Sequence, residues 1–301
     1  MTITAFMAYE AEKECLSDSD ENKTCQAGDP VTIDAELCSG CGICANICPY
    51  AILSKREKGL VPSVSRERVA ACCQCGHCEA ACPAGAISLS CPCAGPLPEY
   101  SREPPVTAGQ LMQHIAGRRS IRHYTQDTVP KDVLEQVFSL VRYAPTGMNR
   151  QTVHWLVIHD PSRVRELAGT VIAWAKEIQR SSPEHPLAPL FPVLTGAWDQ
   201  GIDLVCHGAP HLIIAHGHRD DPAVFTDAVI ALTHLDLAAP VFHLGTCWGG
   251  LVQIAFEASP DIAEMLGIPE DHHPLYAMMI GYPRYQYLRI PRRDMAKITW
   301  G

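Results

Sequence analysis

Hydrophobic and polar residues follow a regular pattern only in the second, larger part of the chain. Beyond residue 110, apolar positions recur at the three- and four-residue spacing of buried helix faces or run together as short strands. Helices are expected after Thr107 and Pro130, residue types that suit helix starts. Further helices are expected over residues 161–179, 222–243 and 260–267, and strands over residues 153–158, 211–215 and 276–280. Because these elements alternate without close βαβ spacing, the pattern favours an α+β fold.

The first third of the chain lacks this periodicity. Residues 1–30 hold seven acidic and two basic residues and show no apolar pattern, which predicts an acidic arm. Residues 91–109 contain five prolines, a density that resists helix and sheet and predicts an extended connector. The expected organisation is an acidic arm (1–30), a small cysteine-rich domain (31–92), a proline-rich linker (93–109) and an α+β domain (110–301).

Two copies of one cysteine motif lie in the cysteine-rich segment, offset by 34 residues. Each reads C-x2-C-x2-C-x3-C-P, the first beginning at Cys38 and the second at Cys72. Three closely spaced thiolates can hold three corners of a cubane cluster, and the fourth cysteine of each motif ligates the other cluster. The motif therefore predicts two [4Fe–4S] clusters, one held by Cys38, Cys41, Cys44 and Cys82 and the other by Cys72, Cys75, Cys78 and Cys48.

Zinc is the alternative ligand for clustered cysteines. Pairs of C-x2-C suffice for zinc, but zinc explains neither the third cysteine nor the proline of each motif. The segment instead resembles the bacterial two-cluster ferredoxin domain over residues 31–92. Cys73 stands beside the second motif and is expected to be a packed thiol rather than a ligand. Cys91 and Cys93 form a C-x-C pair, which can bind a metal or form a disulfide, although a surface role is favoured. No specific role is assigned to these two cysteines or to Cys15 and Cys25.

Composition narrows the function classes further. The 301 residues include 15 cysteines, and 47% are hydrophobic, so the chain can bury a sizeable core. A net charge of −9 argues against nucleic acid or an anionic membrane as the main partner. No apolar stretch approaches a membrane span, and residues 1–16 do not resemble a secretory signal. We therefore expect a cytoplasmic protein, in which clustered thiols more often bind metal than form disulfides.

Basic residues gather in two short segments of the α+β domain. The segment RRSIR follows the first expected helix, and RIPRR lies near the end of the chain. Guanidinium forks and a hydroxyl suit a phosphate dianion, although RRSIR by itself is equally compatible with a solvated basic helix end. The segment GTCWGG (245–250) departs from the dinucleotide-binding pattern G-x-G-x-x-G, which counts against a Rossmann fold.

Six segments, in this order, resemble the FMN-dependent nitroreductase family over about residues 110–301. They are RRSIR (118–122), APTGMNRQ (144–151), GAPHLII (208–214), LGTCWGG (244–250), LGIPED (266–271) and GYP with RIPRR (281–283 and 289–293). The resemblance implies an α+β sandwich that binds FMN at the interface of a homodimer. Two departures are present: Thr152 stands where many relatives have proline, and the spacing of the C-terminal segment differs.

The same resemblance implies which residues contact the flavin. The arginines and Ser120 would contact its phosphate and ring edge, the APTGMNRQ segment would approach from the partner chain, and two glycines would pass beside the isoalloxazine. The implied set is Arg118, Arg119, Ser120, Arg122, Pro145, Thr146, Gly147, Asn149, Gln151, Gly249, Gly250, Arg289, Arg292 and Arg293. No catalytic acid or base is assigned, because the cofactors carry the chemistry.

Other reactive side chains have simpler interpretations. The histidines at 207, 211, 216 and 218 form a ligand-rich run, but it is typical of a buried strand leading into a loop. Cys247 can be a nucleophile, but packing beside Trp248 is favoured.

The two halves together predict an oxidoreductase that reduces a small organic substrate, with electrons passing through the clusters to FMN. NAD(P)H, a ferredoxin or another low-potential donor is the expected electron source. One alternative is an electron-transfer or redox-sensing module without small-molecule turnover. Another is a nitroreductase-fold enzyme with non-reductive flavin chemistry. The sequence does not indicate the substrate, because loops such as residues 180–200 would form its pocket.

Overall fold

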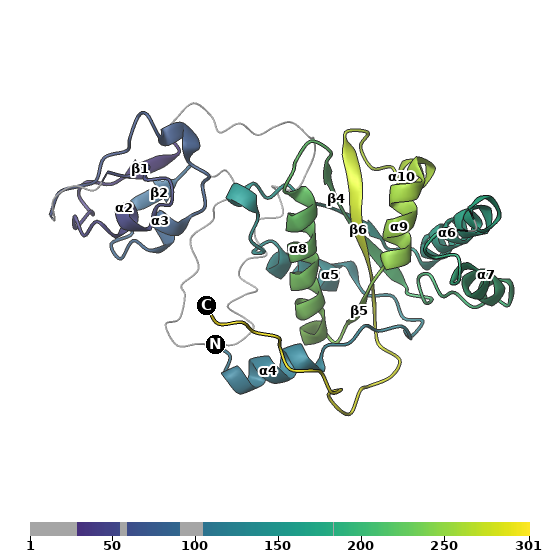
Figure 1. Cartoon of the computed structure of the whole chain (residues 1–301). Helices are drawn as coiled ribbons and strands as arrows, with labels where there is room; N and C mark the ends of the chain where they lie inside the picture. Colours follow the sequence, from purple (N-terminus) through teal and green to yellow (C-terminus); the bar gives the residue numbers. More distant parts are fainter. Residues whose placement is uncertain (1–28, 55–58, 91–104, 183) are drawn as a thin grey trace. The chain divides into compact units, whose positions relative to one another are not determined.

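The computed structural model describes residues 29–54, 59–90, 105–182 and 184–301. The chain forms two compact units, residues 1–103 and 104–301, which we call the N-terminal and C-terminal units (Figure 1). The predicted acidic arm up to residue 28, most of the predicted linker, and Cys15, Cys25, Cys91 and Cys93 lie outside the described residues.

The described part of the N-terminal unit consists of a two-stranded sheet with short helices between its strands. Its two strands, β1 (Val31–Ile33) and β2 (Ile87–Leu89), pair antiparallel and bring the two ends of the described unit together. Between them lie the short helices α2 (Ile43–Ile47) and α3 (His77–Ala80) and the 3-10 turn η2 (Val69–Ala71). The core is small, as expected for so short a segment, and consists of Val31, Cys44, Ala45, Leu53 and Ile87.

The C-terminal unit is built around a four-stranded antiparallel sheet in the order β3–β4–β6–β5. The strands are β3 (His154–Ile158), β4 (His211–His218), β5 (Gly245–Trp248) and β6 (His272–Gly281). The central strands β4 and β6 are buried almost throughout, so both faces of the sheet must be covered by helices.

Helices cover the two faces of this sheet as two separate layers (Figure 1). One face packs Ile213 and Met278 against α5 (Lys131–Val141) and α8 (Val224–Ala238). The other packs the adjacent residues Leu212 and Met279 against α6 (Pro161–Ser181), α7 (Phe191–Asp199), α9 (Gly250–Ala258) and α10 (Pro260–Met265). Successive side chains of a strand point to opposite faces, so the apolar runs fill both cores.

The remaining elements extend from this sandwich. Helix α4 (Ala108–Gly117) begins at Thr107, whose hydroxyl accepts the backbone N–H of Gln110 in a capping box. The 3-10 turns η3 (Gly147–Asn149) and η4 (Ala239–Phe242) follow α5 and α8. Residues 284–301 form no regular structure and are exposed throughout.

The α+β class expected from the sequence is confirmed, together with the strands β3, β4 and β6. Among the helices and strands of the C-terminal unit, β5, α7 and α9 were not predicted. Strand β5 lies in the glycine-rich LGTCWGG segment, and its edge pairing with β6 depends on residues far along the chain. The expected helix over 222–243 ends at Ala238 and tightens there into η4.

Helix α8 with η4 is the one described segment long and apolar enough to cross a membrane by length and composition. Here it has a different role. Leu232 and Leu235 are fully buried between α5 and the sheet, so the apolar character of α8 is that of a core helix.

Candidate cofactor sites

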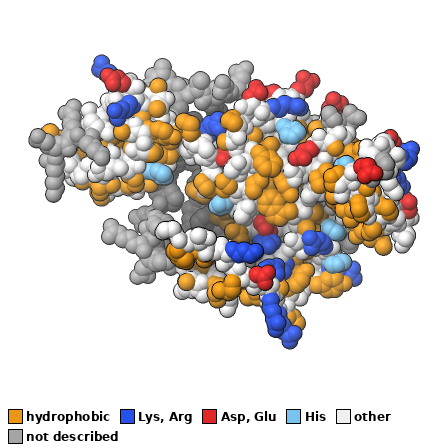
Figure 2. Space-filling view, viewed as in Figure 1, with side chains coloured by type: hydrophobic (Ala, Val, Ile, Leu, Met, Phe, Trp, Pro, Cys, Tyr) orange, Lys and Arg blue, Asp and Glu red, His pale blue; other side chains and the backbone are white. Residues whose placement is uncertain are grey.

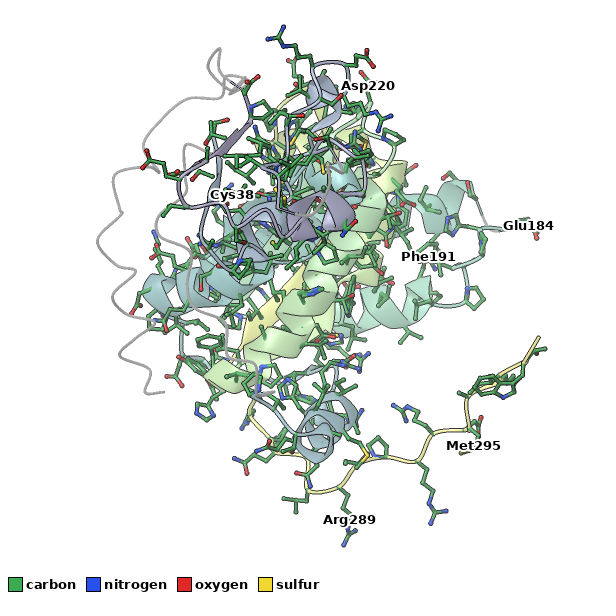
Figure 3. All side chains as sticks on the ribbon, turned by 90° about the vertical axis from the view of Figure 1, so that its left-hand side faces the viewer. Cys38, Glu184, Phe191, Asp220, Arg289 and Met295 are labelled. Atoms are coloured by element: carbon green, nitrogen blue, oxygen red, sulfur yellow. The ribbon has the colours of Figure 1, made fainter. Side chains whose placement is uncertain are left out.

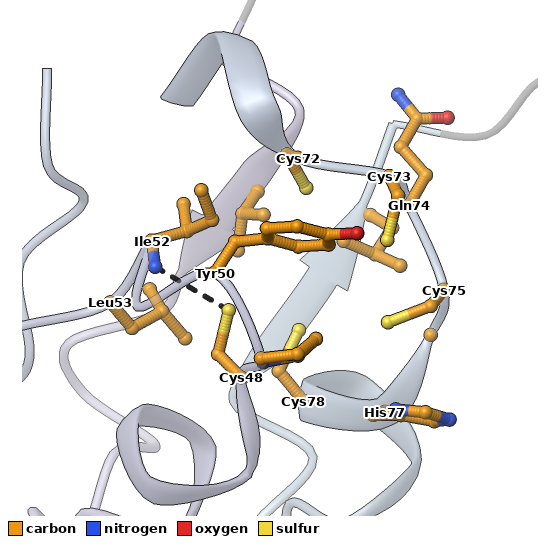
Figure 4. Close-up of a pocket in the computed structure, with 14 residues that line it drawn as sticks. Cys48, Tyr50, Ile52, Leu53, Cys72, Cys73, Gln74, Cys75, His77 and Cys78 are labelled. Carbon is orange, nitrogen blue, oxygen red and sulfur yellow. Dashed lines mark hydrogen bonds between the residues drawn. The ribbon is translucent and has the colours of Figure 1, made fainter. Parts of the chain in front are cut away.

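Two pockets in the N-terminal unit are each lined by three cysteines of one motif and the fourth cysteine of the other, and Figure 4 shows the first of them. The first is lined by Cys72, Cys75, Cys78 and Cys48. The second is lined by Cys38, Cys41, Cys44 and Cys82. The fold therefore groups the eight cysteines in the crossed arrangement that the motif spacing predicts.

The backbone of the two motifs repeats along with the cysteines. Gly42 and Gly76 precede α2 and α3 with φ of 73° and 75°, a left-handed conformation that favours glycine. The backbone N–H of Ile52 donates to Cys48 Sγ at 3.4 Å, and that of Ala86 donates to Cys82 Sγ at 3.3 Å. Such hydrogen bonds to sulfur help to set the properties of a bound cluster.

The chemistry of these pockets fits a cluster. Among the described residues, no group of three Cys, His, Asp or Glu side chains is arranged to hold a single metal ion. The cysteines surround two pockets instead. Burial, together with the nearby Cys75 and Cys48, raises the pKa of Cys78 to about 11. Iron binds the thiolate, so a bound cluster would supply the positive charge that this buried group lacks.

In the C-terminal unit, the RRSIR segment follows α4 and runs along the outer side of β5. Ser120 forms a parallel bridge with Thr246, and the N–H of Ile121 donates to Thr246 O at 2.8 Å. The fold thus brings RRSIR together with the LGTCWGG segment, more than 120 positions later.

The three arginines of RRSIR have different environments. Arg118 forms an ion pair with the buried Asp236 on α8, at 3.3 Å. The Arg119 guanidinium donates to Ala116 O at the end of α4, a favourable place for a cation, while its buried Nε has no partner. The Arg122 side chain is exposed and reaches the neighbourhood of Cys247, where it opposes the rise in the thiol pKa that burial causes.

The APTGMNRQ segment is backbone-strained and tied to the other end of α8. Met148, Asn149 and Gln151 all have φ between 52° and 54°, a conformation that costs about 1 kcal/mol or more for each non-glycine residue. The N–H of Gly147 donates to both carboxylate oxygens of Asp227, at 3.0 and 3.1 Å. Strain of this kind often marks a ligand-binding segment.

Within one chain, RRSIR and APTGMNRQ do not meet. Their anchors on α8, Asp236 and Asp227, are nine residues apart, or roughly 14 Å along the helix axis at about 1.5 Å per residue. Pro145, Thr146, Gly147, Asn149 and Gln151 therefore lie together at one end of α8, and Arg118, Ser120 and Arg122 lie near the other.

Gly249 and Gly250 lie where β5 passes into α9. The N–H of Gly249 donates to Ala277 O at 2.8 Å, and a Cβ on Gly249 would lie 3.2 Å from both Cβ and O of Ala277. The backbone therefore fits closely against β6 here. Gly250 is the first residue of α9 and has more space around it.

The arginines of RIPRR do not join RRSIR. Arg289, Arg292 and Arg293 lie in the exposed C-terminal segment, which runs away from the sandwich, with Arg289 and Met295 labelled in Figure 3. The Arg293 guanidinium donates to the carbonyl of the neighbouring Arg292 at 2.9 Å, a contact within the segment itself.

Three of the four histidines in the run lie on β4, and two of these contact histidines of other segments. His211 is fully buried: its Nε2 accepts the N–H of Val129 at 2.7 Å, so its Nδ1 carries the proton and donates to His159 O at 2.8 Å. At the other end of β4, His216 Nδ1 lies 2.9 Å from His272 Nδ1. Burial lowers the pKa of both His211 and His216 to about 4. Cys247 is 3% exposed, in agreement with a packed thiol.

Sequence reasoning missed the two buried acids that organise the C-terminal unit. Asp227 and Asp236 are 3% and 5% exposed and hold Gly147 and Arg118. Asp236 also accepts hydrogen bonds from Thr246 and Trp248. The sequence did contain a signal for them, because both lie inside the apolar run VFTDAVIALTHLDLA. Burying a carboxylate in such a helix is unfavourable unless a partner compensates its charge.

Comparison with known proteins identifies both units. A model of the nitroreductase family matches residues 115–282, and a model of a 4Fe-4S dicluster domain matches residues 37–87. The FMN reductase [NAD(P)H] of Bacillus subtilis is 26% identical over 185 residues, which cover 61% of this chain and 70% of that protein. These matches confirm the resemblances seen in the sequence.

Two further similarities concern one unit each. An iron–sulfur protein of the CoB–CoM heterodisulfide reductase of Methanocaldococcus jannaschii is 42% identical over 71 residues, covering 19% of this chain but only 11% of that protein. A crystal structure of a nitroreductase with bound FMN from Bacteroides fragilis is similar with a TM-score of 0.51 at 21% identity. The match covers 64% of this chain and 98% of that one, and it supports the fold of the C-terminal unit.

Proposed function

We propose a function for this chain, which belongs to the nitroreductase family. In this proposal it is an FMN-dependent oxidoreductase that receives its electrons through two [4Fe–4S] clusters. The observation that carries the proposal is the crossed grouping of the cysteines. Each pocket has three ligands from one motif and one from the other, as two clusters in one small domain require. A domain of this kind, joined to a nitroreductase unit, has electron delivery as its simplest role.

FMN is proposed as the cofactor of the C-terminal unit, in keeping with the FMN named for the Bacteroides fragilis structure. The exposed guanidinium of Arg122 and the half-buried guanidinium of Arg118 are available to a phosphate group. The unpartnered Nε of Arg119 offers one more donor nearby. Bound there, FMN would exchange one electron with the clusters and two with an organic substrate.

We propose that two chains are needed to complete each flavin site. The APTGMNRQ residues lie at the far end of α8 from RRSIR, so a second copy would have to supply them. Exposed apolar side chains support such an association: Met112 on α4, and Leu288, Met295 and Trp300 of the C-terminal segment, the last three 88–90% exposed. Figure 2 shows hydrophobic and basic side chains close together where α4 lies. The same association would bring the RIPRR arginines to a partner's flavin.

Within this proposed site, two buried carboxylates hold the flavin-binding segments in position. Asp236 fixes Arg118 and, through Thr246 and Trp248, the edge strand β5. Asp227 fixes the strained turn that begins at Gly147. We propose a small organic substrate, a cytoplasmic location and a low-potential donor such as a ferredoxin, with NAD(P)H as a second possible source.

The test begins with anaerobic purification of the full chain. The proposal predicts about eight iron, about eight sulfide and one FMN per chain. It further predicts that reduced FMN is reoxidised when a nitroaromatic or quinone is added and is recovered intact afterwards. Reoxidation by no small molecule would favour the electron-transfer alternative, and loss of intact FMN during turnover would favour flavin breakdown.

A further inference from the structure

The pocket around Cys72, Cys75, Cys78 and Cys48 has a fifth thiol in its wall. Cys73 lines this pocket together with the four proposed ligands. Figure 4 shows its sulfur directed into the pocket, on the same side as that of Cys75. The two thiols hydrogen-bond to one another. The sequence led us to expect a packed thiol here, and the structure places this half-buried thiol in the wall of the pocket.

The backbone explains why neighbouring thiols converge. Gln74, between Cys73 and Cys75, has φ of 47°, in the left-handed region, and the chain turns sharply there. The matching residue of the first motif, Gly40, has φ of 65°. A glutamine adopts this conformation less readily than a glycine, so the fold maintains the turn at some cost.

The first motif supplies an internal comparison. Ser39 is the counterpart of Cys73, 34 residues earlier, and it lines the second pocket as Cys73 lines the first. The position therefore faces a pocket in both repeats, but only the second repeat places a thiol there. A hydroxyl is a far weaker ligand for the iron of a cluster than a thiolate.

We propose that Cys73 is an alternative ligand of the second cluster, able to take the iron corner that Cys75 holds. In the exchange, Cys73 Sγ loses its proton and forms a bond to iron, while the bond from iron to Cys75 Sγ breaks and Cys75 takes up a proton. No electron is transferred. The inference rests on the proposed second cluster and extends it: this cluster survives loss or chemical modification of Cys75, whereas the first cluster has no such reserve.

The test measures iron, sulfide and the electron paramagnetic resonance signals of reduced full-length protein, purified anaerobically. Wild type and Cys73→Ser are expected to hold about eight iron per chain. Cys75→Ala is also expected to hold about eight, with an altered signal from one cluster, because Cys73 replaces the missing thiol. The double variant Cys73→Ser/Cys75→Ala should fall to about four.

Matched variants in the first motif serve as controls. Cys41 is the counterpart of Cys75, and Cys41→Ala should fall to about four iron, since Ser39 cannot replace it. Adding Ser39→Cys to Cys41→Ala should restore about eight, which tests the position even where Cys75→Ala does not fold.

The outcomes separate the inference from the proposed function. The inference alone is overturned in two cases, both with eight iron in the wild type. In one case Cys75→Ala holds four iron, and in the other the double variant Cys73→Ser/Cys75→Ala still holds eight. Wild type with about four iron overturns the second cluster and the inference with it.

Discussion

The two units build their sites in opposite ways. In the N-terminal unit, all proposed ligands come from one stretch of 45 residues, Cys38 to Cys82, and one chain completes both pockets. In the C-terminal unit, residues implied in flavin binding come from segments between Arg118 and Arg293, and one chain leaves them in separate places. Local spacing therefore determines the first site, whereas the second depends on tertiary structure and, in our proposal, on a second chain.

The largest expected effect tests the crossed ligation, because loss of a ligand that no neighbouring thiol replaces should remove a whole cluster. Cys48→Ala combined with Cys72→Ala removes two ligands of the same proposed cluster and should leave about four iron per chain. Cys48→Ala combined with Cys38→Ala removes one ligand from each cluster and should leave almost none. If the two double variants show the reverse order of iron content, each motif binds its own cluster.

This difference also explains how much could be predicted from the sequence. The grouping of the cysteines and the strands β3, β4 and β6 follow from spacing and apolar runs, which are local signals. Strand β5 could not be found locally, because its glycine-rich sequence becomes a strand only by pairing with β6. Likewise, no sequence pattern shows that Arg119 turns back to the end of α4 while Arg122 remains exposed.

The second prediction concerns the second chain that we propose completes the flavin site. Deleting residues 284–301 removes an exposed segment with three apolar side chains at 88–90% exposure. If these side chains are buried against a second copy, the full chain is a dimer and the deletion variant a monomer with little FMN. Sedimentation and flavin absorbance measure both properties. A full-length monomer that retains its FMN would contradict the two-chain site.

The third prediction tests whether the exposed Arg122 binds the FMN phosphate or is only one of many charged residues on the surface. Arg122→Glu replaces a proposed phosphate contact with a repelling charge and should weaken FMN binding by roughly 10- to 100-fold, since hydrogen bonds to charged groups contribute about 1.5–3 kcal/mol. Arg163→Glu, on the exposed side of α6, is the matched control and should leave FMN affinity unchanged. Equal affinities in the two variants would exclude RRSIR from the phosphate site.

The smallest expected effect concerns acid stability of the C-terminal unit. The folded unit keeps His211 neutral with a pKa near 4, below its ordinary value of 6.5, so unfolding takes up a proton between these values. This contribution to stability is complete above about pH 6.5 and is lost as the pH falls toward 4, by roughly 3 kcal/mol. His211→Gln should flatten that dependence in denaturant titrations, and the exposed His234→Gln should not. Parallel pH profiles in both would contradict the assignment.

The most direct test of electron delivery is the rate of FMN reduction by stopped flow without oxygen, in the full chain and in a variant lacking residues 1–103. The deletion follows the boundary between the units, keeps both cores of the second unit and retains Thr107 as the cap of α4. A tethered donor acts at high effective concentration. Reduction by reduced ferredoxin should therefore slow by about tenfold or more in the deletion variant, while any reduction by NADPH stays the same. Equal rates with ferredoxin in the two proteins would show that electrons do not enter through the clusters.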